Sequence, residues 1–149
     1  MATIQLPPDF QEFLSLLNRH GVEYLLIGGY AVNLYGFVRA TGDMDVFVAL
    51  SPDNIDRIVA AFHDFGLSNF AADLLQPGKI VRMGVPPLRL EVLNQISGVT
   101  FAEAYASREM MDLSGLSVPV IGLQMLRRNK AASGRPKDLG DLSELPGVE

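Results

Sequence analysis

The sequence has no cysteine and no long hydrophobic run. Without cysteine, neither a disulfide framework nor a thiolate metal site can form. The purely apolar runs are a handful of residues long, whereas a helix that crosses a bilayer needs roughly 20. The first residues, MATIQLPPDF, lack the basic segment and the long apolar stretch of a secretory signal. We therefore expect a cytoplasmic protein with no membrane partner.

Charged residues are also few, at 19% of the chain, while apolar residues make up 48%. This balance favours a folded globule over a disordered chain, and 149 residues suit a single domain that spans 1–149. The formal net charge of −5 argues against a general attraction to nucleic acid. Segment 126–137 differs, because it carries five cations and no acid. It is either a solvated helix end or an anion-binding segment.

Hydrophobic periodicity and turn residues predict alternating helices and strands. Helices are expected over 7–21, 30–37, 52–66, 123–133 and 136–145. Strands are expected over 23–29, 43–50 and 118–122, and two more lie within 79–93 on either side of a turn at 85–87. No prediction is made for 94–115. This order, with its hairpin, predicts an α/β or α+β fold in which helices pack on a small mixed β-sheet.

Two acids stand two residues apart at the start of the strand expected over 43–50. Alternate residues of a strand point to the same face, so Asp43 and Asp45 share a face and Met44 belongs to the opposite, core-facing one. Neighbouring carboxylates repel each other unless a cation lies between them, and Mg²⁺ prefers such oxygen ligands together with phosphates. The alternative is a pair of exposed acids at the beginning of a strand.

A glycine pair precedes these acids, and a third acid follows much later. Gly28 and Gly29 fall between a predicted strand and a predicted helix, where backbone N–H groups can approach a phosphate. Neither the Walker pattern nor the spaced-glycine dinucleotide pattern is present. Glu91 alternates with apolar neighbours on the second hairpin strand and could complete a two-metal site. Alternatively, Glu91 faces solvent and pairs with Arg89 or another base.

Taken together, these residues resemble the DNA polymerase β-type nucleotidyltransferase superfamily. The resemblance is closest to its small bacterial members, which include toxins of toxin–antitoxin pairs, and it covers about residues 22–145. The matching positions are Gly28, Gly29, Arg39, Thr41, Asp43, Asp45, Glu91, Lys130, Arg135, Lys137 and Asp138. Two positions differ from the common pattern of the family. The family often has serine where this chain has Gly29, and it usually has aspartate where this chain has Glu91.

The resemblance implies a nucleotidyltransferase fold and transfer of a nucleoside monophosphate from an NTP such as ATP, with release of pyrophosphate. Asp43, Asp45 and Glu91 would hold Mg²⁺ or Mn²⁺, and Arg39 and Lys130 would screen the charge that develops. Gly28, Gly29, Thr41, Arg135 and Lys137 would bind the nucleotide.

The acceptor stays open at this stage. It would be RNA, including tRNA, or a protein, with the chain acting as a toxin, and a cognate antitoxin, another partner protein or a second copy would complete the acceptor side. The alternatives are an antibiotic-modifying nucleotidyltransferase and an inactive nucleotide-binding or antitoxin module.

Overall fold

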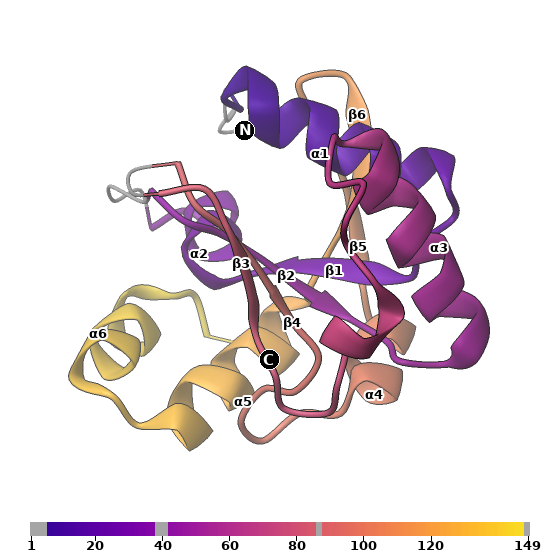
Figure 1. Ribbon diagram of the computed structural model, residues 1–149. Helices are drawn as coiled ribbons and strands as arrows, with labels where there is room; N and C mark the ends of the chain where they lie inside the picture. Colours follow the sequence, from indigo (N-terminus) through magenta and orange to yellow (C-terminus); the bar gives the residue numbers. More distant parts are fainter. Residues whose placement is uncertain (1–5, 38–41, 86–87, 148–149) are drawn as a thin grey trace.

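The computed structural model describes residues 6–37, 42–85 and 88–147 and has an α+β architecture (Figure 1). In chain order the elements are α1 (Pro8–Arg19), β1 (Tyr24–Ile27), α2 (Gly28–Leu34), β2 (Met44–Val48), α3 (Pro52–Asp64), a 3-10 turn (Ala72–Leu74), β3 (Val81–Met83), β4 (Leu90–Leu93), α4 (Phe101–Ala106), β5 (Glu109–Leu113), β6 (Leu116–Val120), α5 (Leu123–Ser133) and α6 (Pro136–Glu144). The predicted fold class, a small mixed sheet with helices packed on it, is confirmed.

The strands form one six-stranded sheet in the order β3-β4-β2-β1-β6-β5. β2 runs parallel to β4, and β1 runs parallel to β6, while the other neighbouring pairs are antiparallel. The register aligns Ile27 of β1 with Asp45 of β2, and Asp45 with Glu91 of β4. The central strands therefore carry the glycine turn and the acids to one place in the sheet.

Helices cover both faces of this sheet. On one face, Tyr24 of β1 donates a hydrogen bond of 2.8 Å from its hydroxyl to Asn18 of α1, and α1 in turn packs on α3 (Figure 1). On the opposite face, Phe47 of β2 packs edge-on against Phe101 of α4, with ring centroids 5.1 Å apart. The face that carries Asp45 is thus covered by aromatic packing at Phe47, two residues further along β2.

The helix ends follow the sequence signals closely. The side chain of Ser51 accepts a hydrogen bond from the backbone N–H of Asn54, as a cap before Pro52 should. α1 buries Phe10, Phe13 and further residues at the same helical spacing. None of the helices in the described part of the chain has the length and apolarity that a bilayer crossing requires.

Two segments differ from what the sequence suggested. α2 begins at Gly28 and not at Tyr30, because the positive φ of Gly28 turns the chain directly from β1 into the helix. Segment 94–115, for which periodicity gave no answer, contains α4 and β5. α4 begins at a capping box between Thr100 and Glu103. This signal is present in the sequence, but it involves only two residues.

Candidate nucleotide and metal site

The turn between β1 and α2 is shaped around the carboxylate of Asp45. Gly28 has φ +67°, and a Cβ placed there would lie 2.3 Å from Oδ2 of Asp45. A side chain at position 28 would therefore strain the backbone and push the acid out of its place. The absence of a side chain at Gly28 is what allows Asp45 to lie against the turn.

The parallel pairing of β2 and β4 brings the three acids together. Asp45 and Glu91 are aligned on neighbouring strands and so point to the same face. Just before these strands begin, the guanidinium of Arg89 lies 2.8 Å from Oδ2 of Asp43 and 3.1 Å from Oε1 of Glu91. Arg82 of β3 lies 3.3 Å from the same oxygen of Glu91. Three acids and two arginines thus form one cluster.

Asp45 is the least compensated member of this cluster. Burial raises the pKa of its carboxyl to about 6, and the neighbouring charges of Glu91 and Asp43 act in the same direction, while Lys137 opposes them. Oδ1 of Asp45 is buried and has no hydrogen-bond partner among the described residues, and the same holds for Nε of Arg89. Buried polar atoms normally have partners, so these two atoms retain the capacity to bind a ligand.

The donor set fits a hard divalent cation in its chemistry, since it consists of carboxylate oxygens and includes an unpaired buried one. Two of these carboxylates are nevertheless already bound to an arginine. Among the described residues, no group of three or more aspartate, glutamate or histidine side chains is placed to hold a metal ion as it stands. Arg89 lies between Asp43 and Glu91 and contacts both of these acids.

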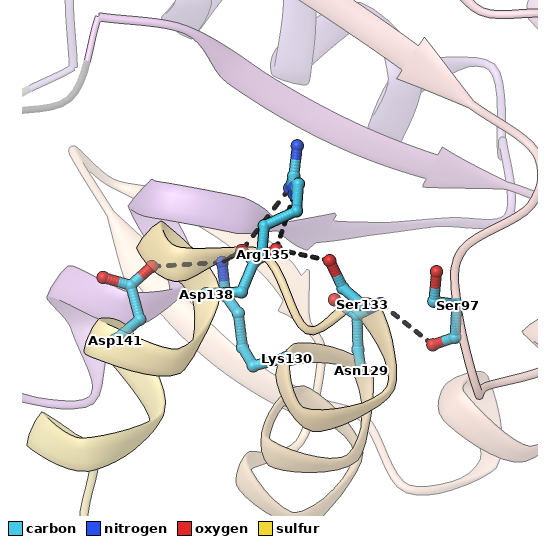
Figure 2. Close-up of polar contacts among 7 residues, drawn as sticks. All are labelled: Ser97, Asn129, Lys130, Ser133, Arg135, Asp138 and Asp141. Atoms are coloured by element: carbon cyan, nitrogen blue, oxygen red, sulfur yellow. Dashed lines mark hydrogen bonds and ion pairs between the residues drawn. The ribbon is translucent and has the colours of Figure 1, made fainter.

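A second polar cluster ties α5 to α6 across the turn at Gly134 (Figure 2). Lys130 is buried, and its Nζ lies 3.1 Å from Oδ1 of Asp138 and 3.2 Å from Oδ2 of Asp141. Asp138 also accepts hydrogen bonds from Ser133 and, at 2.6 Å, from Nε of Arg135. Burial raises the pKa of Asp138, but the bonds from Arg135, Ser133 and Lys130 outweigh it and hold the pKa at about 2.

The remaining arginines of the basic segment 126–137 are also engaged within the protein. Arg127 donates to the carbonyl oxygens of Leu142, Leu145 and Pro146 near the end of α6. Arg128 lies 2.6 Å from Glu103 of α4. With Lys130 and Arg135 paired as well, four of the five cations in this segment hold the helices in place.

Both clusters line one cleft of about 1020 Å³. Of the residues predicted from the sequence, those that line it are Gly28, Gly29, Asp43, Asp45, Glu91, Lys130, Arg135, Lys137 and Asp138. Arg39 and Thr41 lie outside the described residues, so their predicted roles stay predictions. Lys130 reaches the cleft as the partner of two acids, and its predicted role in screening charge stays a prediction.

Sequence reasoning assigned no role in binding to several residues of this cleft. Arg82 and Arg89 flank Glu91, and Asn129 of α5 donates a 3.0 Å hydrogen bond to the carbonyl oxygen of Ser97 (Figure 2). One of these contacts could be expected from the sequence. Residues two apart on a strand share a face, so Arg89 and Glu91 could pair, and the structure shows this contact. Contact between Arg89 and Asp43 depends on the parallel register.

The architecture is similar to that of several solved nucleotidyltransferases. A candidate nucleotidyltransferase from Thermotoga maritima is 13% identical and has a TM-score of 0.65, over 91% of this chain and 88% of that one. The lincosamide antibiotic adenylyltransferase LnuA, solved with lincomycin bound, is 14% identical with a TM-score of 0.59, over 97% and 99% of the two chains. The antibiotic-resistance factor ANT(2'')-Ia is 13% identical with a TM-score of 0.57, over 91% and 79%.

This likeness lies in the backbone and establishes the fold. No family model matches the chain, and no curated protein matches its sequence. The fold is the one that these solved nucleotidyltransferases share, as the glycine pair and the spaced acids suggested.

Proposed function

We propose that this protein is a metal-dependent nucleotidyltransferase that moves a nucleoside monophosphate from an NTP to an acceptor hydroxyl. One observation carries the proposal: the glycine turn after β1, Asp43 just before β2, Asp45 of β2 and Glu91 of β4 line a single cleft. Backbone N–H groups at such a turn suit phosphate, and clustered carboxylates suit a divalent cation. The shared fold of solved nucleotidyltransferases supports the same reading.

In the proposed reaction, the acceptor oxygen forms a bond to the α-phosphorus of the NTP. The bond from this phosphorus to the oxygen that bridges to the β-phosphate breaks, and pyrophosphate leaves with that oxygen and its electron pair. The proton of the acceptor hydroxyl passes to solvent in the open cleft. The step is therefore a displacement at phosphorus, in which the protein positions the reactants and stabilises charge.

The chain's own residues divide this work. Asp43, Asp45 and Glu91 would hold Mg²⁺ or Mn²⁺, which when bound neutralises the triphosphate and lowers the pKa of the acceptor hydroxyl. Gly28 and Gly29 offer backbone N–H groups to the phosphates. Lys137, which lies close enough to Asp45 to lower its pKa, adds a positive charge beside the acids. Arg39 and Thr41 are assigned by their place in the motif alone.

A small hydroxylated molecule is the acceptor that we favour over RNA. The cations of segment 126–137 that would attract an RNA backbone are mostly paired with acids or carbonyl groups of the protein itself. LnuA, whose length this chain matches almost completely, is an antibiotic adenylyltransferase. RNA and protein acceptors are tested in the same experiment.

The test is transfer of label from each NTP, labelled at the α-phosphate, in the presence of Mg²⁺. Separate reactions contain a panel of aminoglycosides and lincosamides, total RNA, or protein extract. Asp45→Asn is the matched variant, and we expect it to reduce labelling by about 100-fold or more. Because ionised Asp45 is destabilised by burial and by its acidic neighbours, Asn at this position should keep or raise the melting temperature.

Three outcomes are informative. Label on a small molecule supports the favoured acceptor, and label on RNA or protein supports transfer with a different acceptor. If the wild-type protein labels nothing, and Mg²⁺ with an NTP leaves its melting temperature unchanged, the proposed function is wrong.

A further inference from the structure

The acid cluster already contains a counter-ion supplied by the chain. The guanidinium of Arg89 contacts Asp43 at 2.8 Å and Glu91 at 3.1 Å, although Asp43 directly precedes β2 and Glu91 belongs to β4. A divalent cation held by the same two acids would need the oxygens that Arg89 now occupies. Arginine and metal therefore compete for one set of ligands.

Arg82 does not play the same part. It contacts Glu91 only, at 3.3 Å, and its side chain is 54% exposed, against 30% for Arg89. An exposed ion pair of this kind contributes little, because water and salt screen it. Arg89 is partly enclosed and bridges two acids, so its removal changes the charge of the cluster where a cation would bind.

Two unpaired atoms show that this arrangement leaves the cluster incomplete. Nε of Arg89 is a buried donor without an acceptor, and Oδ1 of Asp45 is a buried acceptor without a donor, both within the described residues. An anion would satisfy the first and a cation the second. A metal ion bound together with a phosphate group would supply partners for both atoms.

We propose that Arg89 is a resident counter-ion that a divalent cation must displace from Asp43 and Glu91, so that Arg89 keeps metal affinity low until an anion receives its guanidinium. The inference rests on the proposed metal site and concerns its regulation. It predicts weak metal binding by the protein alone and tighter binding when an anion is present, because the two ligands are coupled through one side chain.

The test uses Mn²⁺ alone, with the free ion measured by electron paramagnetic resonance. We expect Arg89→Met to bind Mn²⁺ roughly tenfold more tightly than wild type, within the range for residues that contact metal ligands. Arg128→Met is the control for charge, since its partner Glu103 lies outside the cleft, and it should change the affinity by less than about twofold. Arg82→Met should fall between the two. Equal affinities for Arg89→Met and Arg128→Met would overturn the proposal.

A second measurement uses the wild-type chain and therefore does not depend on whether a variant folds. In crystals soaked with Mn²⁺ and inorganic phosphate, the bound metal should be accompanied by loss of the Arg89 contacts to Asp43 and Glu91. A metal bound to these acids while both contacts persist would contradict displacement. Neither readout involves nucleotidyl transfer. A protein that transfers nothing can therefore still support displacement of Arg89, and an active enzyme can still contradict it.

Discussion

At the scale of single residues, the site depends on a position that has no side chain. Gly28 and Gly21 have nearly the same backbone conformation, with φ +67° and +69°, but a Cβ at Gly21 would meet nothing within 4 Å. The two positions therefore separate backbone strain from contact with Asp45. Alanine at either position has to adopt a left-handed conformation, which costs about 1 kcal/mol of unfolding free energy.

We expect Gly28→Ala to lose at least as much stability as Gly21→Ala, because only position 28 adds a clash with Asp45, and we expect the two variants to differ in function. At position 28 the new methyl group displaces the Asp45 carboxylate, because its Cβ would lie only 2.3 Å from Oδ2 of Asp45. Nucleotidyl transfer should therefore fall by roughly 100-fold in Gly28→Ala and stay near the wild-type rate in Gly21→Ala. Chemical denaturation and the labelling assay measure both quantities. A fully active Gly28→Ala would show that the place of Asp45 against the turn is not required.

At the residue scale, the sequence brought together residues whose spacing alone decides their place, and it missed contacts that cross strands. Gly28, Asp43 and Asp45 belong to one continuous stretch and line one cleft, while their predicted chemistry stays a prediction. The contact of Arg89 with Asp43 could not, because it exists only when β2 and β4 pair in parallel with a fixed register. A shift of the register by one residue would send the arginine to the other face.

At the scale of elements, the turn between α5 and α6 is held by charge. Lys130, Asp138 and Asp141 are almost fully buried, and one lysine is shared by two acids (Figure 2). A buried ion pair is strongly destabilising when one partner is lost, since the other charge stays uncompensated. The sequence gives both helices by periodicity, yet it does not show that the lysine faces inward between them.

This cluster predicts a specific sensitivity to acid. The pKa of Asp138 is about 2 in the folded protein, below its ordinary 3.8, so the unfolded chain takes up the proton first as the pH falls. The stabilisation by ionised Asp138 is present above about pH 4 and is lost progressively toward pH 2, and it amounts to about 2 kcal/mol.

Asp138→Asn should therefore be less stable than wild type at pH 7, and the difference should shrink as the pH falls from about 4 to about 2. Urea denaturation at each pH measures it, with Asp53→Asn in the exposed first turn of α3 as the control. A difference that stays constant over this range would show that Asp138 does not titrate with a lowered pKa.

At the scale of the whole molecule, the distribution of charge bears on the acceptor. The sequence left two readings of segment 126–137, a solvated helix end or an anion-binding surface. The structure supports a third, in which Arg127, Arg128, Lys130 and Arg135 bind carbonyl groups and acids of the protein itself. Composition could not reveal this, because the partners come from α4 and α6 and from the end of the chain.

The charge distribution predicts weak binding of RNA with only a shallow dependence on salt. The net charge is −5, and within the described residues Lys137 is the one cation of this segment that makes neither an ion pair nor a side-chain hydrogen bond. Each phosphate neutralised contributes about −0.7 to the slope of log affinity against log salt for a single strand. One free lysine gives a slope of roughly −1, whereas five free cations would give about −3.5.

Fluorescence anisotropy with labelled single-stranded RNA between roughly 50 and 200 mM salt distinguishes these values. Lys137→Met should flatten the slope further, while Arg127→Met, whose guanidinium is bound to carbonyl groups at the end of α6, should leave it unchanged. A slope near −3 in the wild-type chain would mean that the internal pairs open when RNA binds. In that case RNA would replace a small molecule as the favoured acceptor, because the RNA backbone would have displaced the protein's own partners of Arg127, Arg128, Lys130 and Arg135.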